Sequence, residues 1–215
     1  MNHHHALRGL YVITDTALGA GHDLVDQVRS ALQGGARIIQ YRDKYSSTQH
    51  RLDQARRLSM LTQSYQGLLI INDDVDLALA VHADGVHLGR QDTTLAQARE
   101  KLGPDAIIGV SCYNQMALAR QAKQSGADYI AFGRFFPSRT KPEAVQAASE
   151  LLHQARRELN IPLVAIGGIT PENGASLITA GADMLAVIHA VFGQADIRKA
   201  CARFRALFQT EDSPT

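Results

Sequence analysis

Polar side chains at alternate positions follow a short apolar segment near residue 40. These side chains are Gln40, Arg42 and Lys44, and a β-strand here would direct all three to the same side. Arginine offers a planar fork of donors and lysine a point charge, so the set could hold a phosphate or pyrophosphate. A solvated strand end would have the same composition, and these residues alone leave both interpretations open.

Carboxylates follow the next two apolar segments. Asn72-Asp73-Asp74 ends one segment, and Asp92 follows the other. Two carboxylates from neighbouring loops suit Mg2+, which also takes substrate phosphates and water as ligands. Helix capping is the alternative role for each aspartate, and caps are common. His87 stands inside the second apolar run, so we expect a hydrogen-bonded core histidine rather than a ligand or a base.

Hydroxyls, cations and glycines follow the later apolar segments. Ser111 ends one of them, and Gly167-Gly168-Ile169 and Ile188-His189 end two others. A loop over 133–141 contains Ser138, Thr140 and Lys141, and it could grip a phosphate or cover substrates, although a solvated turn would look similar. Paired glycines allow a phosphate to approach backbone amides closely, while a simple glycine turn is the alternative.

These polar groups need parallel strands to bring them together. Short apolar runs alternate with longer amphipathic stretches, a pattern typical of βα units. We predict strands over 10–14, 37–41, 68–71, 85–88, 107–110, 129–132, 163–166 and 184–188, and helices over 24–32, 49–62, 95–102, 115–124, 144–159, 171–179 and 195–208, with a short one over 75–81. Eight such units favour an α/β fold closed as a single-domain (β/α)8 TIM barrel over an open sheet, because closure leaves no edge.

Barrel enzymes carry their chemistry at the carboxyl ends of the strands, where the polar groups above fall. Asp128 and Asp183 instead precede strands, at the opposite end, where a carboxylate more often stabilises the fold. One domain over 1–215 is expected, with 1–7 and 209–215 as flexible tails. The N-terminal histidine run, His3 to His5, receives no function.

The composition excludes several classes of protein. With 22 basic and 21 acidic side chains, the chain lacks the charge expected of a nucleic-acid binder or of a protein that binds anionic membranes. No apolar run approaches the length that a bilayer requires. Cys112 and Cys201 lack the spacing of a metal site, which favours two reduced thiols in a cytoplasmic protein. A homo-oligomer is possible.

Over nearly its whole length the chain resembles thiamine-phosphate synthase. The resemblance rests on the segments 11–15, 40–44, 72–73, 84–89 with Asp92, 109–111, 137–141 and 165–169. It implies a transferase that joins hydroxymethylpyrimidine diphosphate to a thiazole phosphate, or its carboxylated form, and releases pyrophosphate with the help of Mg2+. The implied mechanism is dissociative: the diphosphate leaves first, and the thiazole nitrogen then captures the cation.

The resemblance also implies roles for individual residues. Asp73 and Asp92 would hold the metal ion. The groups with the most direct catalytic effect would be Arg42, Lys44, Ser111 and Lys141. The pyrimidine diphosphate would be held by Gln40, Arg42, Lys44, Asn72, Ser111 and Lys141, and the thiazole phosphate by Ser138, Thr140, Gly168, Ile188 and His189.

The chain departs from the family pattern at two of these positions. Ser138 stands where the family usually has threonine, which keeps the hydroxyl. His189 stands where the family usually has serine, and it places a titratable side chain beside the expected thiazole phosphate. We expect backbone amides to bind that phosphate and His189 to add a donor.

Two other functions stay open at this point. A thiazole tautomerase of the same superfamily would bind thiazole phosphate, but it has no evident need for the Gln40, Arg42, Lys44, Asp73 and Asp92 set. A non-catalytic sensor of a phosphorylated ligand could keep the barrel, yet it would have little reason to keep both carboxylates.

Overall fold

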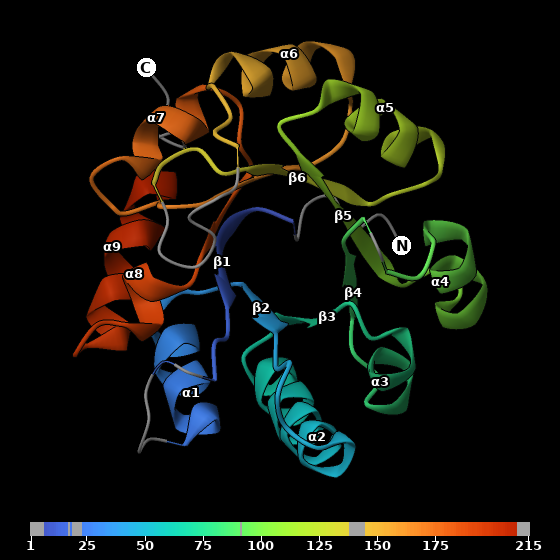
Figure 1. Ribbon diagram of the computed structural model, residues 1–215. Helices are drawn as coiled ribbons and strands as arrows, with labels where there is room; N and C mark the ends of the chain where they lie inside the picture. Colours follow the sequence, from blue (N-terminus) through green and yellow to red (C-terminus); the bar gives the residue numbers. More distant parts are fainter. Residues whose placement is uncertain (1–6, 17, 19–22, 91, 138–144, 210–215) are drawn as a thin grey trace.

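The computed structural model describes residues 7–16, 18, 23–90, 92–137 and 145–209. Eight parallel strands form a closed barrel in sequence order, from β1 through β8 and back to β1. Figure 1 views the barrel from one end, with the helices around the strands. The predicted (β/α)8 barrel is confirmed. Among the described residues, no helix has both the length and the apolar composition needed to span a membrane.

The elements alternate as predicted. The strands are β1 Gly9–Ile13, β2 Ile38–Tyr41, β3 Leu68–Asn72, β4 Gly85–Leu88, β5 Ile107–Tyr113, β6 Tyr129–Gly133, β7 Leu163–Ile166 and β8 Met184–Val187. The helices are α1 Leu24–Gly34, α2 Thr48–Ser64, α3 Val75–Ala80, α4 Leu95–Leu102, α5 Met116–Gln124, α6 Glu150–Glu158, α7 Gly174–Thr179, α8 His189–Phe192 and α9 Ile197–Gln209.

The structure corrects the predicted start of the helix over 144–159. Helix α6 begins at Glu150, and residues 145–148 are not helical. In this segment the backbone N–H of Ala147 donates to Arg134 O at 2.7 Å, and Gln146 Nε2 donates to Phe135 O at 2.8 Å. The segment therefore finds its hydrogen-bond partners in the loop after β6 instead of in a helical turn.

Smaller differences concern other ends of elements. Helix α7 begins at Gly174, three residues after the predicted start, and the four-residue α8 was not predicted. Strand β5 continues to Tyr113 with a register shift between Ser111 and Tyr113. Leu7, which was assigned to a tail, is buried inside the barrel, whereas residues 1–6 and 210–215 lie outside the described part.

Apolar side chains fill two layers. Inside the barrel, the buried cluster includes Ile38, Ile70, Ile107, Val164 and Met184. A larger cluster lies between the strands and the helices. Alternation along each strand produces both layers, because successive side chains point to opposite faces of the sheet. The described side chains therefore pack the interior of the barrel.

Carboxylates before the even-numbered strands tie the barrel together at its other end. Asp84, Asp128 and Asp183 each accept the backbone N–H of an odd-numbered strand, at Leu69, Ile108 and Leu163 respectively, with distances of 2.7 to 2.8 Å. Asp128 also accepts from Arg99 at 2.6 Å and Asp183 from Arg156 at 2.5 Å. The predicted stabilising role of Asp128 and Asp183 is thus confirmed.

Asp128→Ala is expected to lower the free energy of unfolding by about 1–3 kcal/mol, because it leaves the partly buried N–H of Ile108 without its acceptor. Chemical denaturation measures this change. Turnover per folded molecule should match that of the original chain, since Asp128 lies at the end of the barrel away from the cavity. A folded Asp128→Ala variant with low turnover would contradict the structural role.

Candidate active site

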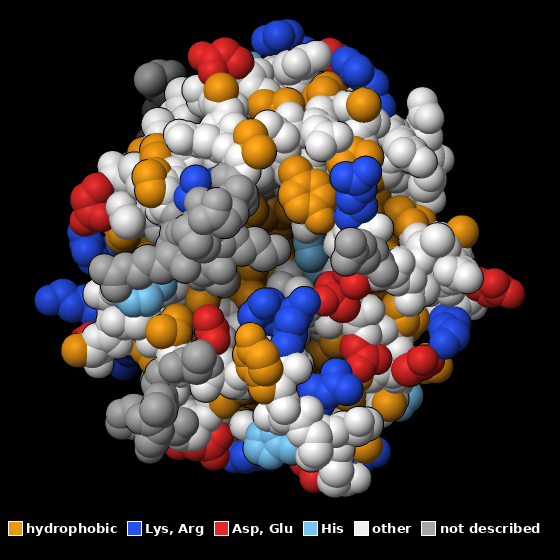
Figure 2. All heavy atoms as spheres, in the orientation of Figure 1, with side chains coloured by type: hydrophobic (Ala, Val, Ile, Leu, Met, Phe, Trp, Pro, Cys, Tyr) orange, Lys and Arg blue, Asp and Glu red, His pale blue; other side chains and the backbone are white. Residues whose placement is uncertain are grey.

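A cavity of about 710 Å3 opens at the end of the barrel where the strands finish. Figure 2 shows a hollow at the centre of this face, with Lys, Arg, Asp and Glu side chains beside it. Seven predicted site residues line the cavity: Gln40, Arg42, Asn72, Ser111, Gly168, Ile188 and His189. They come from strands β2, β3 and β5 and from the segments after strands β2, β7 and β8. Closure of the barrel brings these distant segments together.

Arg42 stands where β2 gives way to its loop. Its backbone N–H donates to Thr14 Oγ1 at 2.9 Å, so the loop is tied to the end of β1. Asp43, which is buried, turns away from the cavity and accepts from the N–H groups of Tyr45 and Ser46 at 3.1 Å each. Among the described residues, the guanidinium of Arg42 has no ion-pair partner. Its charge is therefore available to an anion in the cavity.

Lys44 and two carboxylates form a neighbouring group. Lys44 Nζ lies 3.2 Å from Asp73 Oδ2, and the carboxyls of Asp73 and Asp92 contact each other. Burial, then the hydrogen bond and charge of Asp92, raise the pKa of Asp73, while Lys44 acts in the opposite direction. A pair of carboxyls in this state favours a nearby cation, because a cation stabilises both ionised forms.

Helix capping does not explain Asp73 or Asp92. Asp74 caps α3 by accepting from Leu77 N at 2.9 Å, and Thr94 caps α4 with a capping box. Asp73 instead adopts φ of 64° at the turn after β3, and Asp92 Oδ2 accepts from Gly89 N at 2.6 Å. Helix capping is therefore the role of Asp74 but not of Asp73 or Asp92.

Both carboxylates fit the chemistry of a Mg2+ site. Among the described residues, no group of three or more His, Cys, Asp or Glu side chains could enclose a metal ion. Mg2+ usually takes one or two carboxylates and keeps its other positions for substrate phosphates and water. Asp73 and Asp92 would leave such positions open, and Asn72, which directly precedes Asp73 in the chain, lines the cavity.

Hydrogen-bonded residues cross the base of the cavity. Gln40 Nε2 donates to the Tyr11 hydroxyl at 2.7 Å, which contacts the Tyr129 hydroxyl at 2.8 Å. His87 Nδ1 lies 3.0 Å from that hydroxyl, and His87 Nε2 lies 2.8 Å from Ser111 Oγ. His87 is thus the hydrogen-bonded buried histidine that the sequence predicted, although it also lines the cavity.

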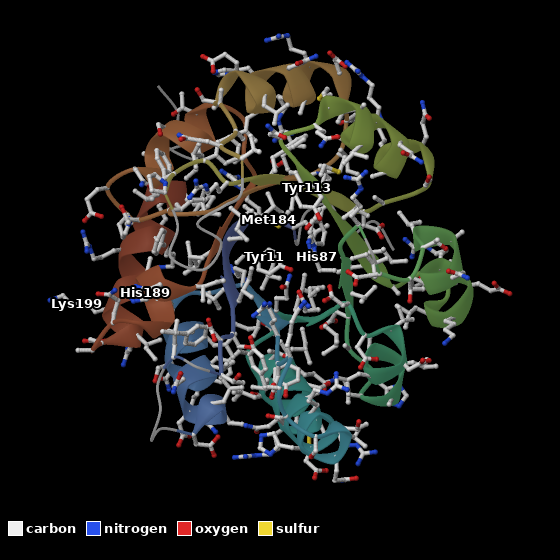
Figure 3. The ribbon with its side chains drawn as sticks, viewed as in Figure 1. Tyr11, His87, Tyr113, Met184, His189 and Lys199 are labelled. Carbon is white, nitrogen blue, oxygen red and sulfur yellow. The ribbon has the colours of Figure 1, made fainter. Side chains whose placement is uncertain are left out.

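Sequence reasoning assigned no role to the hydroxyls of Tyr11 and Tyr129. Their position in apolar strands could have indicated such a role, because the hydroxyl of a buried tyrosine needs a hydrogen-bond partner. Figure 3 shows Tyr11 and His87 near the centre of the barrel. Tyr129 contacts both through its hydroxyl, is fully buried and does not line the cavity.

The loops after β6 and β7 contact each other closely at the opposite side of the cavity. Phe136 N donates to Gly167 O at 3.0 Å. Gly168 has φ of 65°, and a Cβ there would lie 2.3 Å from Pro137 O. The backbone conformation and the close approach of Pro137 therefore require a glycine at position 168, independently of the predicted role in ligand binding. Ser138, Thr140 and Lys141 lie outside the described residues.

His189 begins α8 and lines the cavity. Figure 3 shows His189 and Lys199 together at the side of the barrel, from α8 and α9. A Cβ at Gly193 would lie 2.8 Å from His189 Nε2, so the ring packs over this glycine. His189 thus lines the same cavity as Gly168 and Ile188.

The thiol beside Ser111 takes no part in the site. Cys112 is fully buried in the cluster between strands and helices, and burial raises the pKa of its thiol to about 12. A reactive thiolate needs the opposite environment. Cys112 is one of the two thiols that the sequence analysis expected to be reduced, and it is free and buried in the structure.

Cations, an amide and paired carboxylates at the strand ends of a closed barrel define the class of (β/α)8-barrel enzymes that act on phosphorylated substrates. The family model described as thiamine monophosphate synthase matches residues 10–191. A thiamine-phosphate synthase from Nitrosococcus oceani is 52% identical over 209 residues, 97% of this chain and 96% of the relative. One from Alcanivorax borkumensis is 48% identical over 212 residues, 97% and 98% of the two chains.

A solved structure agrees with these sequences. The thiamine phosphate pyrophosphorylase from Pyrococcus furiosus matches with a TM-score of 0.87 and 38% identity, over 97% of this chain and 98% of that chain. The chain therefore belongs to the thiamine monophosphate synthase family. The family, the barrel fold and the assignment as an enzyme, which were predicted from the sequence, are confirmed.

Proposed function

We propose that this barrel joins 4-amino-5-hydroxymethyl-2-methylpyrimidine diphosphate to a thiazole phosphate, giving thiamine phosphate and pyrophosphate. With the carboxylated thiazole phosphate as substrate, the carboxyl group would also leave as CO2. The observation that supports this most directly is that Arg42 and Asn72 line the cavity, while the next residue, Asp73, contacts both Lys44 and Asp92. A diphosphate leaving group needs this combination of cations and metal-type ligands. A tautomerase needs neither.

The pyrimidine diphosphate would occupy the part of the cavity formed by β2 to β5. Gln40 and Ser111 would contact the pyrimidine side, and Arg42, Lys44 and Asn72 the diphosphate, with Lys141 as the further predicted cation. Asp73 and Asp92 would hold Mg2+, which supplies positive charge to the leaving pyrophosphate. The thiazole phosphate would lie across the cavity, against Gly168, Ile188 and His189, with Ser138 and Thr140 as the further predicted contacts.

The proposed reaction breaks the bond between the pyrimidine methylene carbon and the diphosphate oxygen and forms a bond from that carbon to the thiazole nitrogen. Arg42 and Lys44 stabilise the negative charge that gathers on the departing pyrophosphate. The electron-rich aminopyrimidine stabilises the cation that is left. No protein nucleophile is required, which agrees with the high pKa of the buried Cys112 thiol.

Pyrophosphate release from the purified protein tests the proposal. We expect release only when both substrates and Mg2+ are present, and none with a chelator. Release without the thiazole phosphate would indicate a hydrolase. Binding of thiazole phosphate without any release would favour the tautomerase or the sensor, and proton exchange on the thiazole would then separate those two.

We also propose a cytoplasmic location. The two cysteines, Cys112 and Cys201, are free and buried, as expected of a protein from a reducing compartment.

His189→Ser is expected to weaken binding of the thiazole phosphate, because it removes the imidazole N–H that would donate to this phosphate. Steady-state kinetics between pH 6 and pH 8 should give a Michaelis constant for thiazole phosphate about three- to tenfold higher than that of the unsubstituted protein. Equal constants across this range would reject the donor role.

A further inference from the structure

Five side chains from five strands form one continuous hydrogen-bond chain beneath the cavity. In order they are Gln40, Tyr11, Tyr129, His87 and Ser111, joined at 2.7, 2.8, 3.0 and 2.8 Å. The two ends are substrate-binding candidates that line the cavity. The middle of the chain is Tyr129, which does not reach the cavity. Two residues expected to touch the substrate are therefore connected through the barrel interior.

One direction along these hydrogen bonds forms part of the inference. The Gln40 amide nitrogen donates to Tyr11, and with the Tyr11 proton directed to Tyr129, rather than into the cavity that Tyr11 also lines, Tyr129 is the acceptor. The proton of Tyr129 then goes to His87 Nδ1, which must be unprotonated. A neutral imidazole with a bare Nδ1 carries its proton on Nε2 and donates it to Ser111 Oγ.

This direction determines what the two ends offer to a ligand. Ser111 Oγ accepts from His87, so its own hydroxyl proton remains for a partner in the cavity. Gln40 donates through Nε2, so its Oε1 remains to accept. Reversing the chain would exchange these roles, because Gln40 would then have to turn its oxygen to Tyr11.

We propose that Tyr11, Tyr129 and His87 are positioning residues that fix the hydrogen-bonding polarity with which Gln40 and Ser111 meet the pyrimidine diphosphate. This inference rests on the proposed function for the identity of the ligand. The chain itself is a property of the ligand-free protein, and it can be tested without substrate.

Packing holds the middle of the chain in place. The rings of Tyr11 and Tyr129 meet edge to face with centroids 6.0 Å apart, and His87 stacks on Tyr129 at 5.6 Å. A Cβ at Gly109 would lie 1.9 Å from Tyr129 Cζ, so this position leaves room only for a glycine beside the ring. Burial raises the pKa of both tyrosines. Each hydroxyl thus keeps its one proton, as the directional chain requires.

The protonated nitrogen of His87 reports the direction. In the ligand-free protein at pH 8, the ring 15N resonances, assigned with a His87→Asn variant, should show the proton on Nε2. In Gln40→Glu, the carboxylate can only accept a hydrogen bond. Each hydrogen bond between Gln40 and Ser111 should then reverse its direction, and the proton of the His87 ring should move from Nε2 to Nδ1. With Tyr129→Phe added to Gln40→Glu, the connection is broken and this shift should disappear.

Two results would overturn the proposal. A proton on His87 Nδ1 in the unsubstituted protein would mean that the hydrogen bonds run in the opposite direction, from Ser111 to Gln40. An unchanged tautomer in Gln40→Glu would mean that the chain transmits nothing from Gln40 to His87. Because these spectra need no substrate, a protein with the expected tautomers but no synthase activity would count against the proposed function and leave the chain intact.

Kinetics then test the effect on the ligand. Tyr129→Phe should raise the Michaelis constant for the pyrimidine diphosphate about tenfold and leave that for thiazole phosphate unchanged. Tyr41→Phe is the matched control, because Tyr41 is also a buried strand tyrosine, but its hydroxyl faces Asp43 away from the cavity. Equal kinetic constants in the two variants would refute the positioning role. If Tyr129→Phe failed to fold, the Gln40→Glu spectrum alone would decide the question.

Discussion

Asp73→Asn is expected to lower turnover by at least about a hundredfold. The substitution keeps the size of the side chain and removes the charge that Asp73 shares with Asp92 and Lys44. Asparagine also tolerates the φ of 64° at this position, so the turn after β3 should stay intact. Steady-state rates measured across a range of Mg2+ concentrations would give both the lower turnover and a higher Mg2+ requirement.

Asp74→Asn provides the control in the adjacent position. Asp74 accepts from Leu77 N and pairs with Arg51 at 3.1 Å, and asparagine caps helices about as well as aspartate. This variant should therefore keep nearly full turnover. If Asp73→Asn and Asp74→Asn had the same small effect, neither carboxylate would be a metal ligand. Asp92→Asn should reproduce the Asp73→Asn result.

Arg42→Lys is expected to reduce kcat/KM for the pyrimidine diphosphate by about ten- to a hundredfold. Lysine preserves the charge but loses the planar fork that can hold two phosphate oxygens at once. Arg42 lines the cavity without an ion-pair partner among the described residues, so the loss should fall on the ligand. The constants for both substrates, measured separately, would show an effect mainly on the diphosphate.

The control for this change is Arg51→Lys. Arg51 pairs with Asp74 outside the cavity lining, with both side chains partly exposed, and a lysine at this position keeps the charge of the pair. It should leave both substrate constants unchanged, and both variants should unfold at nearly the same temperature. An Arg42→Lys enzyme with unchanged kcat/KM would show that bidentate contact with the diphosphate is unimportant.

Local sequence patterns predicted the fold well where the signal lies within one element. Strand and helix periodicity identified eight βα units, and the strand interiors agree closely with the structure. The start of α6 was wrong, because residues 145–148 take their partners from the loop after β6. Residues that are remote in the sequence decide such an end, so no local pattern reveals it.

The same distinction applies to the site. The sequence by itself determined which kinds of side chain follow each strand, because alternation and strand ends are local properties. It could not separate Asp73 from Asp74, and only the structure shows that one caps α3 and the other meets Asp92. The residues of the candidate metal pair come from different loops, so their contact depends on the register between β3 and β4.

The amino-acid sequence determined the number of βα units, the apolar layers and the phosphate- and metal-type groups at the strand ends. Only the tertiary structure decided which of these groups touch. Tyr11 and Tyr129 share a hydrogen bond across a separation of 118 residues, and they meet because the closed barrel directs both side chains into its interior. Contacts of this kind depend on strand register and closure, which arise from the packing of the whole chain.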